Sequence, residues 1–437
     1  MKQIKDRILA HSYYSKFLHW GKLVSQAFLG QVIFQLLGFA ITLIIVRNLT
    51  KEDYAVYILL MSIQGMLLSL SGAGIMAGFQ KIGGRVWNND EELSSLLKTA
   101  HTIRVKLLIV ALLVVWIYGV FVCQRQNIPL VKIVIFLCLI TIIVLPDIKM
   151  AFLKTVFLLK KNVWTVQLID IINQSLRFFP ILFLAIICKK IDIYVLLFIT
   201  IIAAYVSFFW GMNKARAVFN INPVINVGYK KEMSYYIRTN WHNSLFYAFK
   251  GQISIFLIAI FGSSSGMADL GALTRISMCI LILSTLISNV FVPIFNKEQN
   301  KKQMIRIYVV YVIIWLFICL LSLILISLFG DYVLKLLGTE YLGLNKALFL
   351  VSIVALLNVG LSLVHGLNIT KGWIKLNIYF SVPLDVLSLI LGLVLFDFTQ
   401  IDGVLYMSIL TASCGVLLAV LNSYIGFKKY KNENSIL

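Results

Sequence analysis

The sequence predicts an all-α integral membrane protein with twelve transmembrane helices in two six-helix bundles and both termini in the cytoplasm. Of its 437 residues, 60% are hydrophobic and only 13% are charged, whereas a soluble domain carries about 25% charged residues. Basic residues are in excess, with 39 Lys and Arg against 18 Asp and Glu. Long apolar stretches recur along the whole chain. Such a chain has too little polar surface to cover a water-soluble particle.

Each predicted span is a stretch of about 20 predominantly apolar residues, the length that crosses a bilayer as a helix. Internal charges occur in the fourth, fifth, seventh and eighth stretches. The connecting segments are short, so no loop is long enough to hold an extramembrane domain. The twelve stretches have the approximate limits 23–46, 54–80, 103–123, 133–157, 163–188, 191–211, 233–261, 268–294, 307–329, 347–369, 378–396 and 403–427.

The basic residues predict the orientation. With the N-terminus inside, the cytoplasmic segments hold 25 Lys and Arg residues and the outward segments hold eight, as the positive-inside rule requires. Residues 1–22 are then a cytoplasmic interfacial segment, 212–232 a cytoplasmic linker and 428–437 a cytoplasmic tail. The two bundles comprise 23–211 and 233–427. The basic excess therefore indicates membrane topology, and nucleic acid is not an expected partner.

Two short matches suggest that the bundles are an internal repeat, as in many transporters. The second span begins with Asp53-Tyr54-Ala55-Val56-Tyr57, and the eighth begins with Asp269-Leu270-Gly271-Ala272-Leu273, about half a chain length later. A Gly-Gln pair precedes each pentad, at Gly30-Gln31 and Gly251-Gln252. The matches fall where a six-plus-six arrangement would place them.

Three motifs carry a resemblance to a known family. They are Arg47-Asn48-Leu49-Thr50-Lys51-Glu52-Asp53-Tyr54-Ala55-Val56-Tyr57 after the first span, Ser71-Gly72-Ala73-Gly74 in the second, and Ala268-Asp269-Leu270-Gly271-Ala272 at the eighth. On these motifs the chain resembles the bacterial polysaccharide flippase family, the O-antigen and capsule repeat-unit translocases of the multidrug/oligosaccharidyl-lipid/polysaccharide exporter superfamily. Ala55 stands where the family usually has Gly. We expect the motifs to cap helices and to let backbones approach closely.

The resemblance implies an alternating-access flippase of the bacterial cytoplasmic (inner) membrane. Its substrate would be an undecaprenyl-diphosphate-linked oligosaccharide repeat unit, used to assemble a surface polysaccharide such as O-antigen of lipopolysaccharide or capsule. Implied partners are the lipid bilayer, Na⁺ or H⁺ as coupling ion for antiport, and polysaccharide polymerase machinery. The resemblance implies no enzymatic activity, no catalytic residue and no cofactor.

Charges within the predicted spans are the candidate site residues, because a charge at the bilayer centre costs roughly 2.5–3.5 kcal/mol and needs a partner or a watery cavity. Asp147 and Lys154 are seven residues apart and therefore share a helix face, and the same holds for Asp170 and Arg177. Each of these residues could equally pair with a residue on another helix. Lys250 and Arg275 have no carboxylate in their own spans, so they are predicted to line an electropositive cavity that binds a diphosphate. The six cationic candidates for substrate binding are Lys250, Arg275, Arg238, Arg177, Lys149 and Lys154.

Four other residues are candidates for binding a coupling ion. Asp385 in the eleventh span has Ser381 one turn before it. Lipid II flippases, of the same superfamily, place a cation site between their seventh and eleventh spans, so the resemblance favours Asp385, while Ser381 stands where a stronger amide ligand is expected. The further candidates are Asp170 and His242; the His242 side chain could sense pH, bind a sugar or bridge helices.

Two alternative functions remain open at the sequence level. An ion-coupled exporter of small organic molecules, including drugs, would share the fold, but an exporter of cations would need an acidic cavity. A membrane sugar polymerase would need a large outward loop. No Gly-Lys phosphate-binding loop is present, which argues against direct ATP use. The six cysteines lie singly, without metal-ligand spacing, so no metal site is predicted.

Overall fold

The computed structural model describes residues 25–26, 28–72, 74–188, 191–216, 224–287 and 291–430, and these residues form helices and loops without a strand. The predicted interfacial segment 1–22 lies outside the described residues. So do most of the predicted tail and Ala73 of the Gly-rich motif.

The first half of the chain begins with a helix over Phe28–Asn48. Six further helices follow, with bounds α2 (Lys51–Ser71), α3 (Ile75–Val86), α4 (Asp90–Arg125), α5 (Leu130–Leu159), α6 (Val163–Cys188) and α7 (Ile193–Arg216). Side chains cap several of these helices, and the cap at Thr50 is the one that the sequence motif predicts. Thr50 accepts a hydrogen bond from the backbone N–H of Asp53 at the start of α2, and Asn89 does the same for Glu91 and Glu92 at the start of α4.

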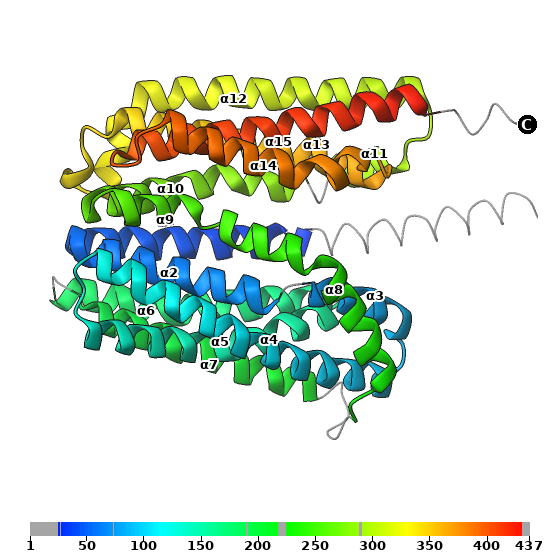
Figure 1. Cartoon of the computed structure of the whole chain (residues 1–437), viewed down its shortest axis with the longest axis horizontal. Helices are drawn as coiled ribbons and strands as arrows, with labels where there is room; N and C mark the ends of the chain where they lie inside the picture. Colours follow the sequence, from blue (N-terminus) through cyan, green and yellow to red (C-terminus); the bar gives the residue numbers. More distant parts are fainter. Residues whose placement is uncertain are drawn as a thin grey trace, which may run out of the picture.

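The described residues of the second half form eight α-helices and one short 3₁₀ turn. Their bounds are α8 (Val227–Lys250), α9 (Ile253–Phe261), α10 (Ser264–Leu286), α11 (Val292–Lys297), α12 (Lys301–Leu337), η2 (Thr339–Tyr341), α13 (Asn345–Thr370), α14 (Lys375–Leu395) and α15 (Ile401–Lys429). In Figure 1, α11 to α15 form the upper group of helices and α2 to α7 the lower group, with α9 and α10 between them.

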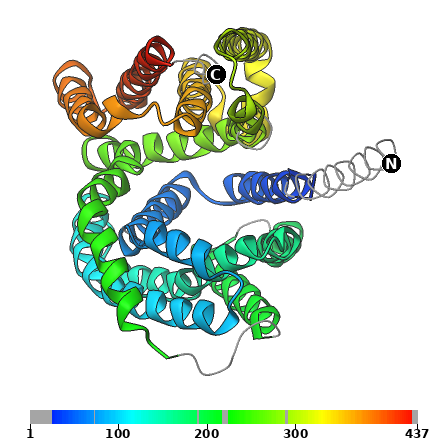
Figure 2. The same cartoon turned by 90° about the vertical axis from the view of Figure 1, so that its right-hand side faces the viewer.

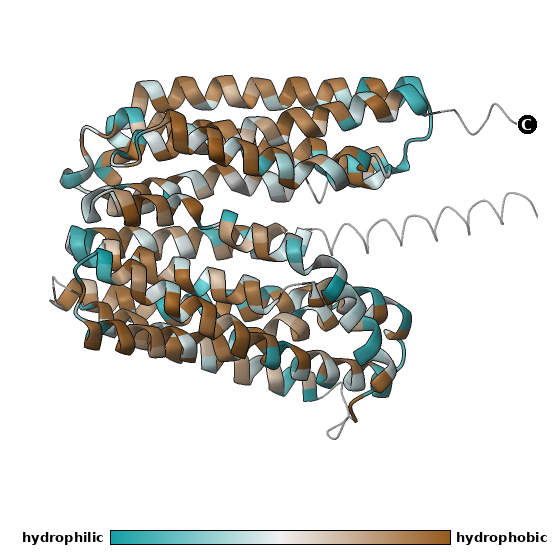
Figure 3. Cartoon of the chain, viewed as in Figure 1, coloured by the Kyte–Doolittle hydropathy of each residue, from teal (hydrophilic) through white to brown (hydrophobic). Residues whose placement is uncertain are grey.

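The helices have the length and composition of membrane spans. Among the described residues, nine are long and apolar enough to cross a membrane, and the bent pair formed by α8 and α9 makes a tenth. The remaining two predicted spans correspond to α10 and to α14, whose apolar part is Tyr379–Leu395. Hydrophobic residues cover the middle of both groups and hydrophilic residues gather toward the helix ends (Figure 3). The predicted all-α membrane fold is confirmed.

Two predicted continuous spans are interrupted. The second ends at Ser71, because Gly74 adopts a left-handed backbone conformation with φ of 69° and starts the separate helix α3. The seventh breaks between Lys250 and Ile253, where the axes of Ser244–Lys250 and Ile253–Phe261 differ by 53°. Hydrophobicity alone could not reveal either break, since both lie within apolar sequence.

The predicted linker 212–232 is largely helical in its described parts. The helix α7 continues to Arg216, and α8 already begins at Val227. The first part of α8 packs against α3 and α4 of the first half. Arg85 of α3 forms an ion pair with Glu232 of α8 (2.5 Å), and Tyr229 of α8 donates a hydrogen bond to Glu92. Viewed from the end in Figure 2, α8 to α10 run along one side of the molecule and connect the two groups.

The hydrophobic core is continuous at one end of the molecule and divided at the other. At the predicted outer end, one cluster of buried side chains includes residues of both halves, from Ile41 to Met407. Toward the predicted cytoplasmic end, one cluster is built around Phe79 and Phe152 of the first half, together with Met233 of α8. A separate cluster is built around Phe295 and Leu363 of the second half. The halves are therefore packed together at the outer end.

Candidate functional site: a cavity in the second half and the seam between the halves

A cavity of about 1010 Å³ lies within the second half of the chain. Its walls come from the end of α8, the start of α9, and the helices α13, α14 and α15. The break after Lys250 contributes directly, since Lys250, Gly251 and Ile253 all line the cavity. The interruption of the seventh span thus forms part of the cavity wall.

Lys250 and Asp385 form an ion pair in this wall, with 2.5 Å between Nζ and Oδ1. The Asp385 side chain is 8% exposed and that of Lys250 is 27% exposed. The sequence prediction that Lys250 lacks a carboxylate partner is therefore wrong. The partner lies on α14, more than a hundred residues away in the sequence, and only the tertiary structure shows that it comes within reach of the end of α8. The sequence predicts that Lys250 binds the substrate and that Asp385 binds the coupling ion. In the structure these two residues form an ion pair with each other.

The rest of the lining is uncharged and partly polar. Ser381, the other predicted ion ligand, shares a hydrogen bond with the Tyr247 hydroxyl (2.5 Å), and Ser254 shares one with Ser408 (3.1 Å). His365 and Asn377 are also hydrogen-bonded to each other (3.1 Å). The lining therefore differs from the predicted electropositive cavity. Of the six predicted substrate-binding cations, Lys250 alone is among the lining residues, and it is paired with Asp385.

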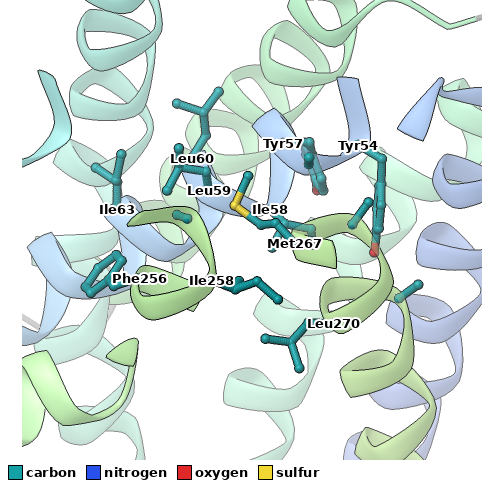
Figure 4. Close-up of a cluster of buried hydrophobic side chains, with 14 of the residues drawn as sticks. Tyr54, Tyr57, Ile58, Leu59, Leu60, Ile63, Phe256, Ile258, Met267 and Leu270 are labelled. Carbon is teal, nitrogen blue, oxygen red and sulfur yellow. The ribbon is translucent and has the colours of Figure 1, made fainter. Parts of the chain in front are cut away.

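A second feature is the seam between the halves, where α2 packs against α9 and α10. Figure 4 shows its buried side chains: Ile58, Leu59 and Ile63 of α2 lie beside Ile258 of α9 and Met267 of α10. Gly271 of the second repeat motif is in close contact with Ile58, since a Cβ at this position would lie 2.5 Å from Ile58 Cγ1. The predicted role of the motif glycine, close helix approach, is confirmed here.

Polar contacts hold the seam at the predicted outer end. Lys51, two residues before the first repeat pentad, forms an ion pair with Asp269, the first residue of the second pentad (3.1 Å). Arg47 donates hydrogen bonds to the carbonyl oxygens of Leu336 (2.8 Å) and Lys335 (3.1 Å). Gln126, at the end of α4, donates to the carbonyl oxygen of Ala259 (2.6 Å) and accepts from Ser264. These contacts join the first half to α9, α10 and α12.

Two of the predicted substrate-binding cations flank a pair of tyrosines on α2. Arg177 of α6 donates a hydrogen bond to the Tyr57 hydroxyl (3.2 Å). Arg275 of α10 lies close enough to Tyr54 to interact electrostatically with its hydroxyl. The rings of Tyr54 and Tyr57 are stacked with centroids 6.3 Å apart. Neither arginine forms an ion pair with a carboxylate of the described residues, so a positive charge from each half approaches the same segment of α2.

The other charges of the first half form a network between α4, α5 and α6. Lys154 of α5 pairs with Asp170 of α6, which is the interhelical alternative left open by the spacing. Asp147 lies within electrostatic range of Lys154, Arg177 and Arg104. Arg104 is 4% exposed and donates to the Ile148 carbonyl oxygen (3.0 Å). Arg104 stands in the first turn of the predicted span 103–123, and the count of basic residues places it on the cytoplasmic side. Because α4 already starts at Asp90, Arg104 lies well inside this helix, where it contacts α5.

The three remaining candidates lie apart from the cavity lining. Lys149 is positioned over the ring of Phe208 on α7, with Nζ 6.0 Å from the ring centroid. Arg238 and His242 are exposed on α8, and the His242 ring lies beside that of Trp241. The structure thus brings Lys250, Asp385 and Ser381 together in one cavity, and Arg177 and Arg275 to the tyrosine pair.

No family model and no curated protein matches the sequence. Solved structures match over nearly the whole chain. An inward-facing multidrug resistance MATE family transporter of the MOP superfamily superposes with a TM-score of 0.69 at 12% identity, covering 91% of this chain and 96% of that one. The lipid II flippase MurJ in an inward closed conformation gives 0.68 at 12% identity, covering 93% and 90%.

An outward-facing MATE family transporter gives a lower TM-score of 0.56, at 14% identity and with 94% and 95% of the two chains covered. The chain therefore has the fold of these membrane transporters and flippases.

Proposed function

We propose that the protein is a flippase that translocates undecaprenyl-diphosphate-linked oligosaccharide repeat units across a bacterial cytoplasmic membrane, for assembly of a surface polysaccharide. The observation that carries the proposal is the approach of Arg177 and Arg275, one from each half, to the tyrosine pair of α2. Neither has a carboxylate ion-pair partner among the described residues, and guanidinium groups are suited to bidentate binding of phosphate oxygens.

The mechanism we propose is alternating access in which the two halves move about the seam. In the described state the outer end is closed by the Lys51–Asp269 pair and by the buried cluster around Ile58 and Met267. The separate clusters at the other end leave the halves free to part there. A head group would then enter from the cytoplasmic side, with its diphosphate between Arg177 and Arg275, while the polyprenyl chain stays in lipid.

Coupling to an ion gradient is part of the proposal, with Na⁺ or H⁺ as the ion. Asp385 and Asp170, the carboxylates predicted for this role, are each paired with a lysine. An ion would therefore have to compete with Lys250 or Lys154 for the carboxylate. A polysaccharide polymerase would accept the translocated unit.

Deletion of the gene followed by analysis of lipid-linked glycans tests this function. We expect complete repeat units to accumulate on the cytoplasmic leaflet and the surface polysaccharide to be lost. Complementation with the intact gene should restore both, and normal surface glycan in the deletion strain would exclude the proposal.

Export of a small organic molecule is the second candidate, because the fold is shared with multidrug resistance MATE transporters. This function predicts that deletion sensitises cells to organic cations and leaves the surface glycan unchanged. The two arginines at the seam disfavour it, since they would repel a cationic substrate. Growth assays on the same deletion strain therefore separate the two candidates.

A further inference from the structure

The cavity in the second half has a different chemistry from the arginine pair at the seam. Its charged lining residues are Lys250 and Asp385, which neutralise each other. A diphosphate in this cavity would lose its water and would compete with Asp385 for Lys250. The cavity is therefore matched to an uncharged ligand.

The lining is rich in groups that both donate and accept hydrogen bonds. Hydroxyl and amide side chains come from every helix of the wall: Thr239, Tyr247, Ser254, Asn358, Asn377, Ser381, Ser408 and Thr411. Sugar hydroxyls are likewise donors and acceptors, so they can replace or extend the pairs that these side chains make among themselves. Asn358 of α13 is an exposed residue of the cavity lining and forms no hydrogen bond with another of the described residues.

The size and position of the cavity agree with a bound sugar. Its volume of about 1010 Å³ is at the upper end of the range of roughly 300–1,000 Å³ for ligand pockets. The short helix α9 borders both features, since Ser254 lines the cavity and Phe256 belongs to the buried cluster at the seam. A head group with its diphosphate at the seam would thus have the cavity on the other side of α9.

We infer that the cavity walled by α8, α9, α13, α14 and α15 binds the uncharged sugars of the lipid-linked substrate, through amide and hydroxyl side chains with Asn358 as a direct contact. This inference rests on the proposed function. Under this inference the head group is bound at two places. Arg177 and Arg275 bind the diphosphate, and the cavity of the second half binds the sugars.

Binding to the purified full chain in lipid nanodiscs tests the inference, with two probes compared. One is undecaprenyl diphosphate, and the other is undecaprenyl diphosphate carrying a neutral oligosaccharide. We expect the glycan-bearing probe to bind about 10-fold tighter, as one or two well-made hydrogen bonds would provide. The variant Asn358→Leu, which keeps the side-chain size, should lose most of this preference and bind bare undecaprenyl diphosphate normally.

Ser362→Ala on the same helix, outside the cavity lining, is the matched control and should keep the preference. Thermal unfolding of each variant checks that it is folded, and Asn358→Gln should recover part of the preference. Equal binding of both probes by the intact protein would overturn the inference, as would tighter binding of an oligosaccharide bearing carboxylates. Either of these results would leave the proposed flippase function standing. If the intact protein bound neither probe, both the inference and the proposed function would be wrong.

Discussion

The two halves of the molecule share a fold plan but use their intramembrane charges differently. In the first half, Arg104, Asp147, Lys154 and Asp170 form a network between packed helices. In the second half, the Lys250–Asp385 pair stands in the wall of a large cavity. In the first half the ion pair joins two packed helices. In the second half the ion pair is part of a neutral, polar surface that faces the cavity. The charge pairs thus join packed helices in the first half, and in the second half one of them lies in the wall of a cavity.

The largest effect is expected at the place where the halves meet. Arg275→Gln should reduce transport of the lipid-linked glycan about 10- to 100-fold, because a hydrogen bond to a charged group contributes about 1.5–3 kcal/mol. Membrane abundance should stay normal, since no carboxylate of the described residues loses an ion-pair partner. The measurement is surface polysaccharide in a complemented deletion strain. Arg238→Gln, which alters an exposed position on α8, is the control, and wild-type transport by Arg275→Gln would show that this charge is structural.

The ion pair in the cavity wall tests the role assigned to the second half. Lys250→Met should lower the free energy of unfolding by about 2–4 kcal/mol, because it leaves the buried Asp385 carboxylate without its partner. Asp385→Asn should cost less, since the Lys250 side chain is more exposed and can reach the cavity. Thermal unfolding in detergent measures both.

The double variant Lys250→Met/Asp385→Asn should recover most of the lost stability, because it leaves no unpaired charge. Losses that simply add would contradict the pairing. The same cycle applied to Lys154 and Asp170 would show whether the two halves differ in how strongly their pairs are coupled.

The close packing at the seam is tested at Gly271. Gly271→Ala places a methyl group 2.5 Å from Ile58 Cγ1, so the helices must separate. We expect a destabilisation of about 1–3 kcal/mol, typical of overpacking in a core. Gly84→Ala is the matched control, since a Cβ there meets nothing within 4 Å; it should stabilise α3 by about 0.5–1 kcal/mol. Equal melting temperatures for the two variants would mean that α2 and α10 are not tightly packed.

The smallest effect is expected at the outer ion pair. Lys51→Gln or Asp269→Asn should cost about 0.5–1 kcal/mol, because the pair is partly exposed. This corresponds to a roughly 2- to 5-fold shift toward a state open at the outer end. Labelling of a cysteine introduced at Ser264, in a background without native cysteines, with a membrane-impermeant maleimide measures the shift. The exchange Lys51→Asp/Asp269→Lys should reverse it, and a failure to do so would assign the effect to lost packing.

Sequence patterns predicted most of the helices. Each predicted span has a helix at its position, because an apolar stretch of sufficient length forms a helix in lipid whatever its neighbours are. The breaks at Gly74 and after Lys250 escaped prediction, since Gly within an apolar stretch is compatible with a continuous span. Among the candidate site residues, Lys250 was predicted to bind substrate and Asp385 and Ser381 to bind an ion, but their meeting in one cavity was not predicted. Asn358 was not predicted, because its span also holds Ser352, Ser362, His365 and Asn368, and the sequence does not distinguish those that line the cavity.

The sequence by itself determined what depends on neighbouring residues: the membrane fold, the span positions, the helix cap at Thr50 and the motif glycine that permits close packing. Tertiary structure alone decided which charges meet. Lys250 forms an ion pair with Asp385, Lys154 with Asp170, and Lys51 of the first half with Asp269 of the second. The physical reason is that an ion pair forms over a few ångströms, a distance set by which helices pack together and in what rotation. Spacing along one helix cannot specify a partner on another.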